Sequence, residues 1–502
     1  MWNTVGVFVV FVTIFSLAYY RWRRRKVIAM LAKMDGPRSL PLVGHTHMLH
    51  LFGKEIFNTF LQYGDRYTSP IAVEMGPMVY IFVYTPEQLQ VVLNSPHCLE
   101  KPLQYSFFQV SRGIFSAPVD LWKILRKLIT PSFGPGLLSS FVPIFNEKSS
   151  VMVEQMAKNV GKPQRDYYSE IVLCFMDTIC NTAFGVDCDL QRSPAGAEYV
   201  ETQEKYIDIV TERYLKPWQY LNFIYRFTNA YQIFKKRHGK FLALLTQATR
   251  INEVEDMLSK NSISKDYQDK DVGAKKIPIF VEKLLDEIQK SGHIKREDID
   301  DHIVTMCFAG NDTTATTMSN ILLMLAMHPD IQERVYQEII AACPDRNQQV
   351  SIEDAGKLTY TEMVCKETMR HFSIAPVIGR TATQDVKLND DITIPANSTL
   401  ICCFYKLHMD PKNWGPDVKN FNPDNFLPDL VAKRHPYSFL PFSGGPRNCL
   451  GVRYAWLSMK IMLVHILRRY RLRTTLTMDT ITVKFNSFMK IEDGCPITVE
   501  ER

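Results

Sequence analysis

The sequence lacks several patterns that would point to common classes of protein. It has no glycine-rich GxGxxG fingerprint between a strand and a helix, so no flavin- or nicotinamide-binding domain is evident in the chain. Beyond the basic cluster at 21–26 that ends the first apolar run, it has no Lys/Arg-rich patch interleaved with aromatic residues, and a net charge of +6 is small for 502 residues, so nucleic acid is not expected as a partner. Its 11 cysteines show no CxxC pair and no paired spacing, which argues against a zinc site or a disulfide framework and for a reducing compartment.

What the sequence does contain begins with an apolar run, Val5 to Tyr20, that ends in a cluster of arginine and lysine at 21–26. About 20 residues suffice for a helix to cross the hydrocarbon layer, and the basic cluster holds its end in the cytosol. A cleaved signal peptide would place charge before the run and small residues after it. We therefore predict a membrane anchor over residues 1–26 and a cytosolic body.

Residues 27–50 contain a stretch rich in proline and glycine, Gly36 to Gly44, that cannot be a regular helix. It is predicted to be a stiff hinge between anchor and body, although an ordinary linker has the same composition. The remaining residues, 51–502, form the predicted catalytic body.

The periodicity of the body predicts a mainly α protein with small β-sheets. Apolar residues recur at three- and four-residue spacing over 121–129, 168–183 and 303–327. Apolar residues alternate with other residues over 67–84, which predicts two strands. The polar segment 260–276 is predicted to be a surface loop.

The segment Phe442 to Gly451 reads FSGGPRNCLG and precedes an apolar helical run at 452–469. Its three glycines allow a tight turn and a close approach to a flat cofactor. Cys449 lies at the predicted helix start, where the helix dipole and free N–H groups favour the thiolate, which can ligate iron. A lone cysteine in a turn is more often structural. Five specified positions in Phe-x-x-Gly-x-Arg-x-Cys-x-Gly would, however, recur by chance only on the order of once in 10,000 such chains.

This segment resembles the haem-binding loop of cytochromes P450, and other motifs of that family follow in order over nearly the whole chain. The segments 311–314 (NDTT) and 434–437 (RHPY) are most similar to the microsomal family-4 clan of animals, particularly its insect branches. The resemblance implies the cytochrome P450 fold, haem b with Cys449 as the axial iron ligand, and a body on the cytosolic face of the endoplasmic reticulum. It also implies haem contacts for the following residues: Phe442, Arg447, Gly451, Trp122, Arg126 and Arg380.

The helix predicted around 303–327 is interrupted by small and polar residues at 309–314. Ala309 and Thr313 share one face at four-residue spacing, and the small Ala309 lets that face lie against a flat ring. The resemblance implies that Thr313 assists the activation of dioxygen and that Asp312 passes protons from solvent. The alternative for Thr313 is a hydrogen bond back to its own helix.

Glu367 and Arg370 lie one helical turn apart and can form an ion pair. In the family this pair is buried behind the haem, and an arginine of a Pro-Glu-Arg-Phe-like segment completes it. Here Asn425 stands in that place, and its amide can still bond a charged partner or a carbonyl.

The resemblance implies a monooxygenase that inserts one oxygen atom of O2 into an apolar substrate, a lipid, hormone or foreign compound. Electrons would come from NADPH through cytochrome P450 reductase, and cytochrome b5 would be a further partner. These partners would dock on a basic face that includes Lys127, Lys433, Arg434 and Lys460. Some family-4 members bind haem covalently through a glutamate where Ala309 stands, so haem is predicted to be non-covalent here. Three other functions are considered. One is a haem-thiolate isomerase or lyase acting on peroxides, and the intact Asp312-Thr313 pair argues against it. The others are a non-catalytic haem-binding protein and a protein without haem.

The substrate pocket is predicted from positions in family-like loops, and its residues are apolar. They are Phe107, Phe108, Phe115, Phe308, Ala309, Val377 and Phe488.

Overall fold

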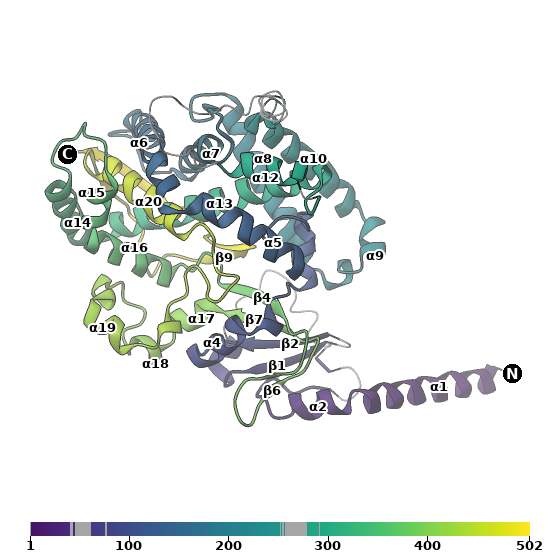
Figure 1. Ribbon diagram of the computed structural model, residues 1–502. Helices are drawn as coiled ribbons and strands as arrows, with labels where there is room; N and C mark the ends of the chain where they lie inside the picture. Colours follow the sequence, from purple (N-terminus) through teal and green to yellow (C-terminus); the bar gives the residue numbers. More distant parts are fainter. Residues whose placement is uncertain are drawn as a thin grey trace.

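A large helical part and a smaller part with the main β-sheet make up the structure (Figure 1), as predicted for a mainly α fold. The computed structural model describes residues 2–40, 44–45, 62–75, 78–251, 253, 256, 279–290 and 292–502. The predicted surface loop at 260–276 lies outside these residues.

The helices follow in chain order, and all three helical segments predicted from periodicity are confirmed. They are α1 (Trp2–Arg23), α2 (Arg25–Leu31), α4 (Pro86–Asn94), α5 (Val119–Ile129), α6 (Pro135–Ala157), α7 (Tyr168–Phe184), α8 (Ala195–Tyr214), α9 (Asn222–Arg226), α10 (Asn229–Thr249), α12 (Phe280–Lys290), α13 (Ile299–Met327), α14 (Pro329–Ala342), α15 (Ile352–Lys357), α16 (Thr359–His371), α17 (Phe404–His408), α18 (Pro411–Trp414), α19 (Pro428–Lys433) and α20 (Val452–Leu467).

The main sheet has the strand order β1-β2-β7-β4, formed by Ile71–Met75, Met78–Val83, Thr399–Cys403 and Val377–Thr381. The pairs β1-β2 and β7-β4 are antiparallel, and β2-β7 is parallel. The strand pair predicted at 67–84 is confirmed by β1 and β2. The smaller sheets comprise β3 (Arg165–Asp166), β11 (Pro496–Glu501) and β8 (Tyr470–Arg473); β9 (Val483–Asn486) and β10 (Phe488–Ile491); and β5 (Val386–Lys387) and β6 (Thr393–Ile394).

Helix α13 runs through the centre of the helical part (Figure 1) and packs against α7, α10, α16 and α20. All of its side chains from Ala315 to Ala326 are buried, which explains why the sequence from Ile321 to Ala326 is apolar on every face. The central position matters for function, because Ala309, Gly310, Thr313 and Thr314 of this helix line a cavity.

Local signals fix where other helices begin and end. Thr85 caps α4, since its hydroxyl accepts a hydrogen bond from the N–H of Gln88, and Pro86 occupies the first turn. Helix α7 ends at Gly185, whose φ of +73° is the left-handed conformation that glycine adopts without strain.

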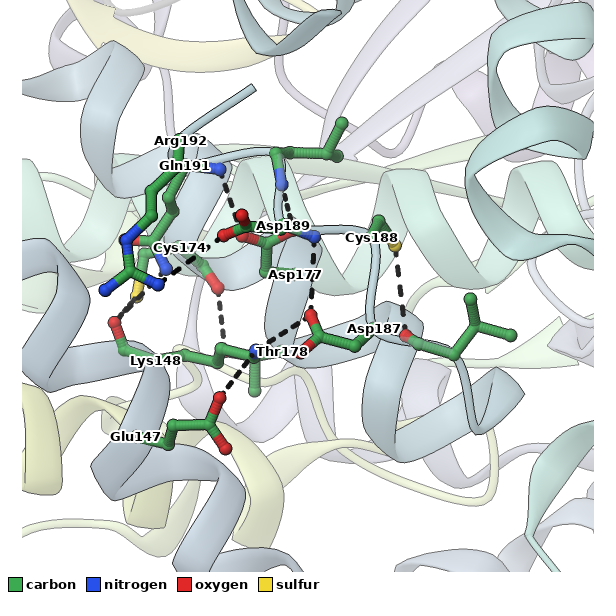
Figure 2. A network of polar contacts seen from close by, with 12 residues as sticks. Glu147, Lys148, Cys174, Asp177, Thr178, Asp187, Cys188, Asp189, Gln191 and Arg192 are labelled. Carbon is green, nitrogen blue, oxygen red and sulfur yellow. Dashed lines mark hydrogen bonds and ion pairs between the residues drawn. The ribbon is translucent and has the colours of Figure 1, made fainter.

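A polar network joins α6 and α7 to the loop that precedes α8 (Figure 2). The buried carboxylate of Asp177 accepts hydrogen bonds from the backbone N–H groups of Leu190 and Gln191, at 2.7 and 3.0 Å. The buried ammonium of Lys148 contacts Asp187 at 2.8 Å and Glu147 at 2.9 Å. These bonds hold the loop against the two helices.

The N-terminal segment forms helix α1, which projects away from the body (Figure 1). Among the described residues, no single helix combines the length and hydropathy of a membrane span. One pair of consecutive helices reaches that length and hydropathy only when taken together, namely α5 with its short extension to Phe133 and α6, and the two are bent by 58° relative to each other. The predicted transmembrane helix is thus not confirmed. Of the predicted hinge at 27–50, the part up to Leu31 belongs to α2, and the backbone O of Asp35 accepts the N–H of Ala72 in the sheet at 2.9 Å. Residues 41–43 and 46–50 lie outside the described residues.

Candidate functional site

A cavity of about 360 Å³ lies between helix α13 and the loop that precedes α20. Its lining is mostly apolar and aromatic, and its floor includes the whole segment from Leu440 to Ser443 and from Arg447 to Gly451. Among the described residues that line it, four side chains are cationic and none is a carboxylate: Lys101, Arg126, Arg380 and Arg447.

Cys449 lies in this loop and is the one exposed cysteine of the 11, all of which are described and free. Its side chain faces the cavity, and its backbone N–H donates to the carbonyl of Phe442 at 2.9 Å. Burial raises the pKa of the thiol, while the N–H of Gly451 and the charge of Arg126 lower it less. The N–H of Gly451 at the start of α20 and the charge of Arg126 are the groups that favour the thiolate here.

Gly445 is required for a different reason from the predicted approach to a cofactor. Its φ is +70°, and a Cβ atom there would lie 1.9 Å from the carbonyl oxygen of Leu93, at the end of α4. Gly451 does line the cavity, and a Cβ there would meet only Phe133, at 3.9 Å. The loop is thus held by protein packing at Gly445 and left open to the cavity at Gly451.

The arginines predicted to hold haem propionates all line the cavity but differ in what they already bind. Arg126 donates to the backbone and side-chain oxygens of Asn448, at 2.8 and 2.6 Å. Buried Arg380 donates to the carbonyl of Gly379 at 2.9 Å. Trp122 lies under Arg447, whose guanidinium carbon is 4.6 Å from the ring centre.

Arg447 carries the strongest indication that an anion binds here. Its Nη2 donates to the carbonyl of Ala117 at 2.8 Å, but its buried Nε and Nη1 have no partner among the described residues. Burial, together with the charge of Arg380, lowers the pKa of Arg447 to about 10. Unpaired buried donors on a cation are costly, so carboxylates such as the propionates of haem fit this end of the cavity.

The small and polar face of α13 lies opposite the loop. Ala309, Thr313 and Thr317 line the cavity, as their four-residue spacing predicts. The hydroxyl of Thr313 donates to the carbonyl of Ala309 at 2.7 Å, which is the alternative hydrogen bond considered above. The oxygen of that hydroxyl remains free to accept, because donating uses only its hydrogen.

Asp312 lies on a different side of α13 from Thr313 and does not line the cavity. It is fully buried, and its Oδ1 accepts hydrogen bonds from Tyr168, from Gln203 at 3.3 Å and from Lys490 at 3.2 Å. These bonds link Asp312 to the side chain of Lys490, which is 15% exposed, and the proton path through Asp312 stays a prediction.

Four of the predicted pocket residues line the cavity, namely Phe115, Phe308, Ala309 and Phe488. The other three lie elsewhere. Phe107 packs on Tyr214 and Tyr220, at ring distances of 5.5 and 5.1 Å, and Phe108 stands behind Phe115 and Phe308. Val377 faces a small separate pocket beside the sheet, because alternate residues of a strand point to opposite faces and it is Ile378 that lines the cavity.

The Glu367-Arg370 pair is fully buried, with contacts of 2.7 and 2.8 Å. Asn425 donates from its amide to Glu367 at 3.1 Å. Arg434, predicted on a docking face, instead donates to the backbone carbonyl of Asn425 and lies 4.3 Å from the centre of the Trp414 ring.

Lys460, also predicted on the docking face, is buried and forms an ion pair with Glu362 at 2.8 Å. Lys127 and Lys433 remain exposed. Two of the four predicted docking cations are therefore structural.

Lys101 was missed by sequence reasoning, since a lone lysine in a loop gives no signal. It reaches the cavity because Glu100 and Thr381 form a β-bridge that fixes this loop beside β4. That bridge places Lys101 next to Arg380.

A cysteine under a cavity lined by cations and a helix of small residues defines a site for a flat, anionic, thiolate-bound cofactor. Comparison with known proteins agrees: the family model "Cytochrome P450" matches residues 34–498. The chain therefore belongs to the cytochrome P450 family, which makes it a haem-dependent monooxygenase.

The similar proteins include members of family 4. Cytochrome P450 4c21 of Blattella germanica is 33% identical over 479 residues, with 94% of each chain covered. Cytochrome P450 4c3 of Drosophila melanogaster is 28% identical over 513 residues, covering 100% of this chain and 95% of that one. Cytochrome P450 4V2 of Rattus norvegicus is 29% identical over 497 residues, covering 96% and 91%. The predicted resemblance to family 4 is confirmed.

Proposed function

We propose that haem b binds non-covalently in this cavity, with Cys449 as the axial ligand and its propionates at Arg447 and Arg380. The observation that carries the proposal is the pairing of an exposed Cys449 with the unpartnered Nε and Nη1 of Arg447 in one cavity. When bound, the haem supplies the activation of dioxygen for insertion of one oxygen atom into a substrate. Ala309 offers no carboxylate for a covalent link.

The chain's own residues position the substrate and the protons. Phe115, Phe308 and Phe488 give the cavity an aromatic wall that favours an apolar substrate and excludes water. Thr313 lines the cavity from α13, and its hydroxyl holds a proton that it donates to the carbonyl of Ala309. Asp312 would pass protons through its contacts with Tyr168 and Lys490.

Electrons are proposed to arrive from NADPH through cytochrome P450 reductase, or through cytochrome b5. Lys127 on α5 and Lys433 at the end of α19 are the exposed cations that would meet an acidic partner.

The protein is proposed to act at the cytosolic face of the endoplasmic reticulum membrane, held by α1. Two apolar surfaces support this location. Helix α1 exposes Phe8, Phe11 and Phe15, and the region of α9 exposes Phe223 and Phe227, the latter by 90%. Exposed basic residues lie on α9 and on the following helix α10, namely Arg226, Lys235 and Lys236, and such a combination favours an anionic lipid surface.

The first test is a carbon monoxide difference spectrum of the reduced, detergent-solubilised protein beside a Cys449→Ala control. The red-shifted band of a haem thiolate in the wild type and its absence in the control are expected. Haem without that band would contradict the thiolate, and folded protein without haem would contradict the whole proposal. NADPH-dependent substrate oxidation with added reductase then separates a monooxygenase from an isomerase or a passive haem carrier.

A further inference from the structure

Cys180 and Cys188 lie outside the residues that line the cavity, and hydrogen bonds hold their two chain segments together. After the end of α7 the chain turns back, because the N–H of Val186 donates to the carbonyl of Cys180 at 3.1 Å. Four residues later, the N–H of Leu190 donates to the carboxylate of Asp177, one turn earlier on α7, at 2.7 Å. Cys188 stands between these two bonds (Figure 2), so it is held beside the part of α7 that carries Cys180.

The two thiols differ in exposure but contact each other. Cys180 is fully buried, whereas Cys188 is partly exposed between the exposed residues Asp187 and Asp189. The hydrogen bond of the Cys180 thiol to Cys188, together with burial, raises the pKa of Cys180 well above its ordinary value. Cys188 is therefore the sulfur that a dissolved reagent reaches first, and Cys180 supplies a second thiol next to it.

The thiol of Cys188 also acts at the end of another helix. It donates to the carbonyl of Ala248, in the last turn of α10, at 3.2 Å. The last four carbonyls of a helix have no partner within that helix, so this thiol satisfies one of them. Helix α10 packs against α8 and α13. A reaction that removes the proton of the Cys188 thiol would therefore remove a hydrogen bond that holds the end of α10.

We propose that Cys188 and Cys180 form a reversible disulfide by exchange with a small disulfide such as oxidised glutathione. The pair lies apart from the haem site, so the inference does not rest on the proposed function. In a reducing compartment a disulfide of this kind forms only transiently and responds to the redox state of its surroundings. Its formation would release the carbonyl of Ala248 and tie the loop after α7 to that helix.

The exchange takes place in two steps. The thiolate of Cys188 attacks one sulfur of the small disulfide, whose S–S bond breaks and releases one small thiol. Cys180 then loses its proton and attacks the sulfur of Cys188, so that the second small thiol leaves as the new S–S bond forms. The two cysteines lose two electrons and two protons, and the two released thiols carry them away.

Cys307 on α13 is a third sulfur near this pair. Burial, and then the charge of a Cys188 thiolate, raise the pKa of Cys307 well above its ordinary value. Cys180 is the favoured partner of Cys188, because its thiol is already hydrogen-bonded to Cys188 and because the bond at Val186 holds their segments together.

The test equilibrates the full-length, haem-loaded protein with excess oxidised glutathione, blocks the remaining thiols and identifies linked peptides by mass spectrometry. The wild type is expected to contain the Cys180–Cys188 disulfide, and excess reduced glutathione should restore both thiols. The matched control is Cys174→Ala, a buried position on α7 whose thiol donates to the carbonyl of Lys148 at 3.2 Å. This variant should form the disulfide as the wild type does.

Removal of one thiol at a time separates the two steps. Cys180→Ala lacks the thiol that completes the exchange, so glutathione should remain bound to Cys188. Cys188→Ala should leave Cys180 free, because glutathione does not reach a buried thiol. Hydrogen exchange follows the consequence for α10. The amides of its last turn are expected to exchange about threefold faster in the oxidised wild type, because a thiol hydrogen bond is weak.

Free thiols at both positions of the oxidised wild type would overturn the proposal. A stable glutathione adduct at Cys188 of the wild type, or a bond between Cys188 and Cys307, would overturn it as well. Unchanged hydrogen exchange at the end of α10 in protein that carries the disulfide would overturn the role of the Cys188 thiol there.

Discussion

Glu367 is a buried residue whose carboxylate holds several groups of the protein in place. Its carboxylate accepts hydrogen bonds from Arg370 and Asn425 and from the backbone N–H of Asn422. Burial alone would raise the pKa of Glu367, but the hydrogen bonds from Arg370 and His371 lower it to about 2. The carboxylate is therefore charged at neutral pH, and its partners depend on that charge.

Glu367→Gln is expected to destabilise the protein by about 3–5 kcal/mol, because it leaves the buried guanidinium of Arg370 without an anion. Urea unfolding followed by circular dichroism measures this change. The matched control is Asp424→Asn, whose contact with Arg334 is exposed and 3.7 Å long, and which should cost less than about 1 kcal/mol. Equal effects of the two substitutions would contradict a structural role for the buried pair.

Asp177 allows a test of pH dependence at the residue scale (Figure 2). Burial raises its pKa to about 6 from the usual 3.8, although two backbone N–H groups oppose the shift. A raised pKa in the folded state means that protonation stabilises the fold. This stabilisation is complete below the unfolded pKa of 3.8 and is lost as the pH rises through about 6.

The wild type is therefore expected to lose about 1 kcal/mol of stability relative to Asp177→Asn between pH 5 and pH 8. Urea unfolding at the two pH values measures the difference. Asp189→Asn, in the same loop but exposed, serves as the control and should show no such dependence. A constant difference between wild type and Asp177→Asn would show that the carboxyl does not titrate in this range.

At the scale of elements, the loop before α20 depends on its contact with the end of α4. Gly445→Ala places a Cβ 1.9 Å from the carbonyl of Leu93 and forces a residue with a side chain to adopt a φ of +70°. The loop must shift, and Cys449 shifts with it. We expect a loss of more than about 2 kcal/mol in stability and a reduced haem content.

The haem content is measured from the carbon monoxide difference band per mole of purified protein. Gly239→Ala is the control, because it lies within α10 with no atom within 4 Å of the added Cβ, and it should be neutral or slightly stabilising. Full haem content in Gly445→Ala would mean that the α4 contact does not position the loop.

The positions of several helices follow from local sequence alone. Periodicity predicted α5, α7 and α13, since each buries one or more faces against neighbouring helices. Spacing along α13 placed Ala309 and Thr313 on the cavity, because positions four apart share a face. Local patterns of this kind determine which face a residue occupies, but not what that face meets.

Contacts between distant segments could not be predicted in the same way. Nothing local shows that Lys490 pairs with Asp312, or that Arg434 reaches the carbonyl of Asn425. Val377 was placed in the pocket although its neighbour Ile378 lines it, since one residue of register reverses the face of a strand. These outcomes depend on how elements far apart in the sequence pack together.

At the scale of the whole molecule, the apolar residues with the largest exposed fractions lie on α1 and near α9, where the proposed membrane contact would lie, while Leu430 and Val431 on α19 are exposed by 39% and 46%. Helices α1 and α9 extend on the same side of the view in Figure 1, and α19 lies on the other. Phe227 is 90% exposed near α9, whereas Lys433 is exposed at the end of α19. If α1 anchors the body and α9 touches the lipid, Phe227 contacts lipid and Lys433 faces water.

A polarity-sensitive fluorophore attached through Phe227→Cys is expected to shift to shorter wavelength when the full-length, haem-loaded protein is incorporated into vesicles with anionic lipid. The same fluorophore at Lys433→Cys, the matched control, should not shift, because that site faces water in the proposed orientation. The buried or haem-facing cysteines of the chain should label little. Labelled wild-type protein measures that background. A shift at Lys433 without one at Phe227 would reverse the proposed orientation, and equal shifts would mean that α9 does not define the membrane-facing side.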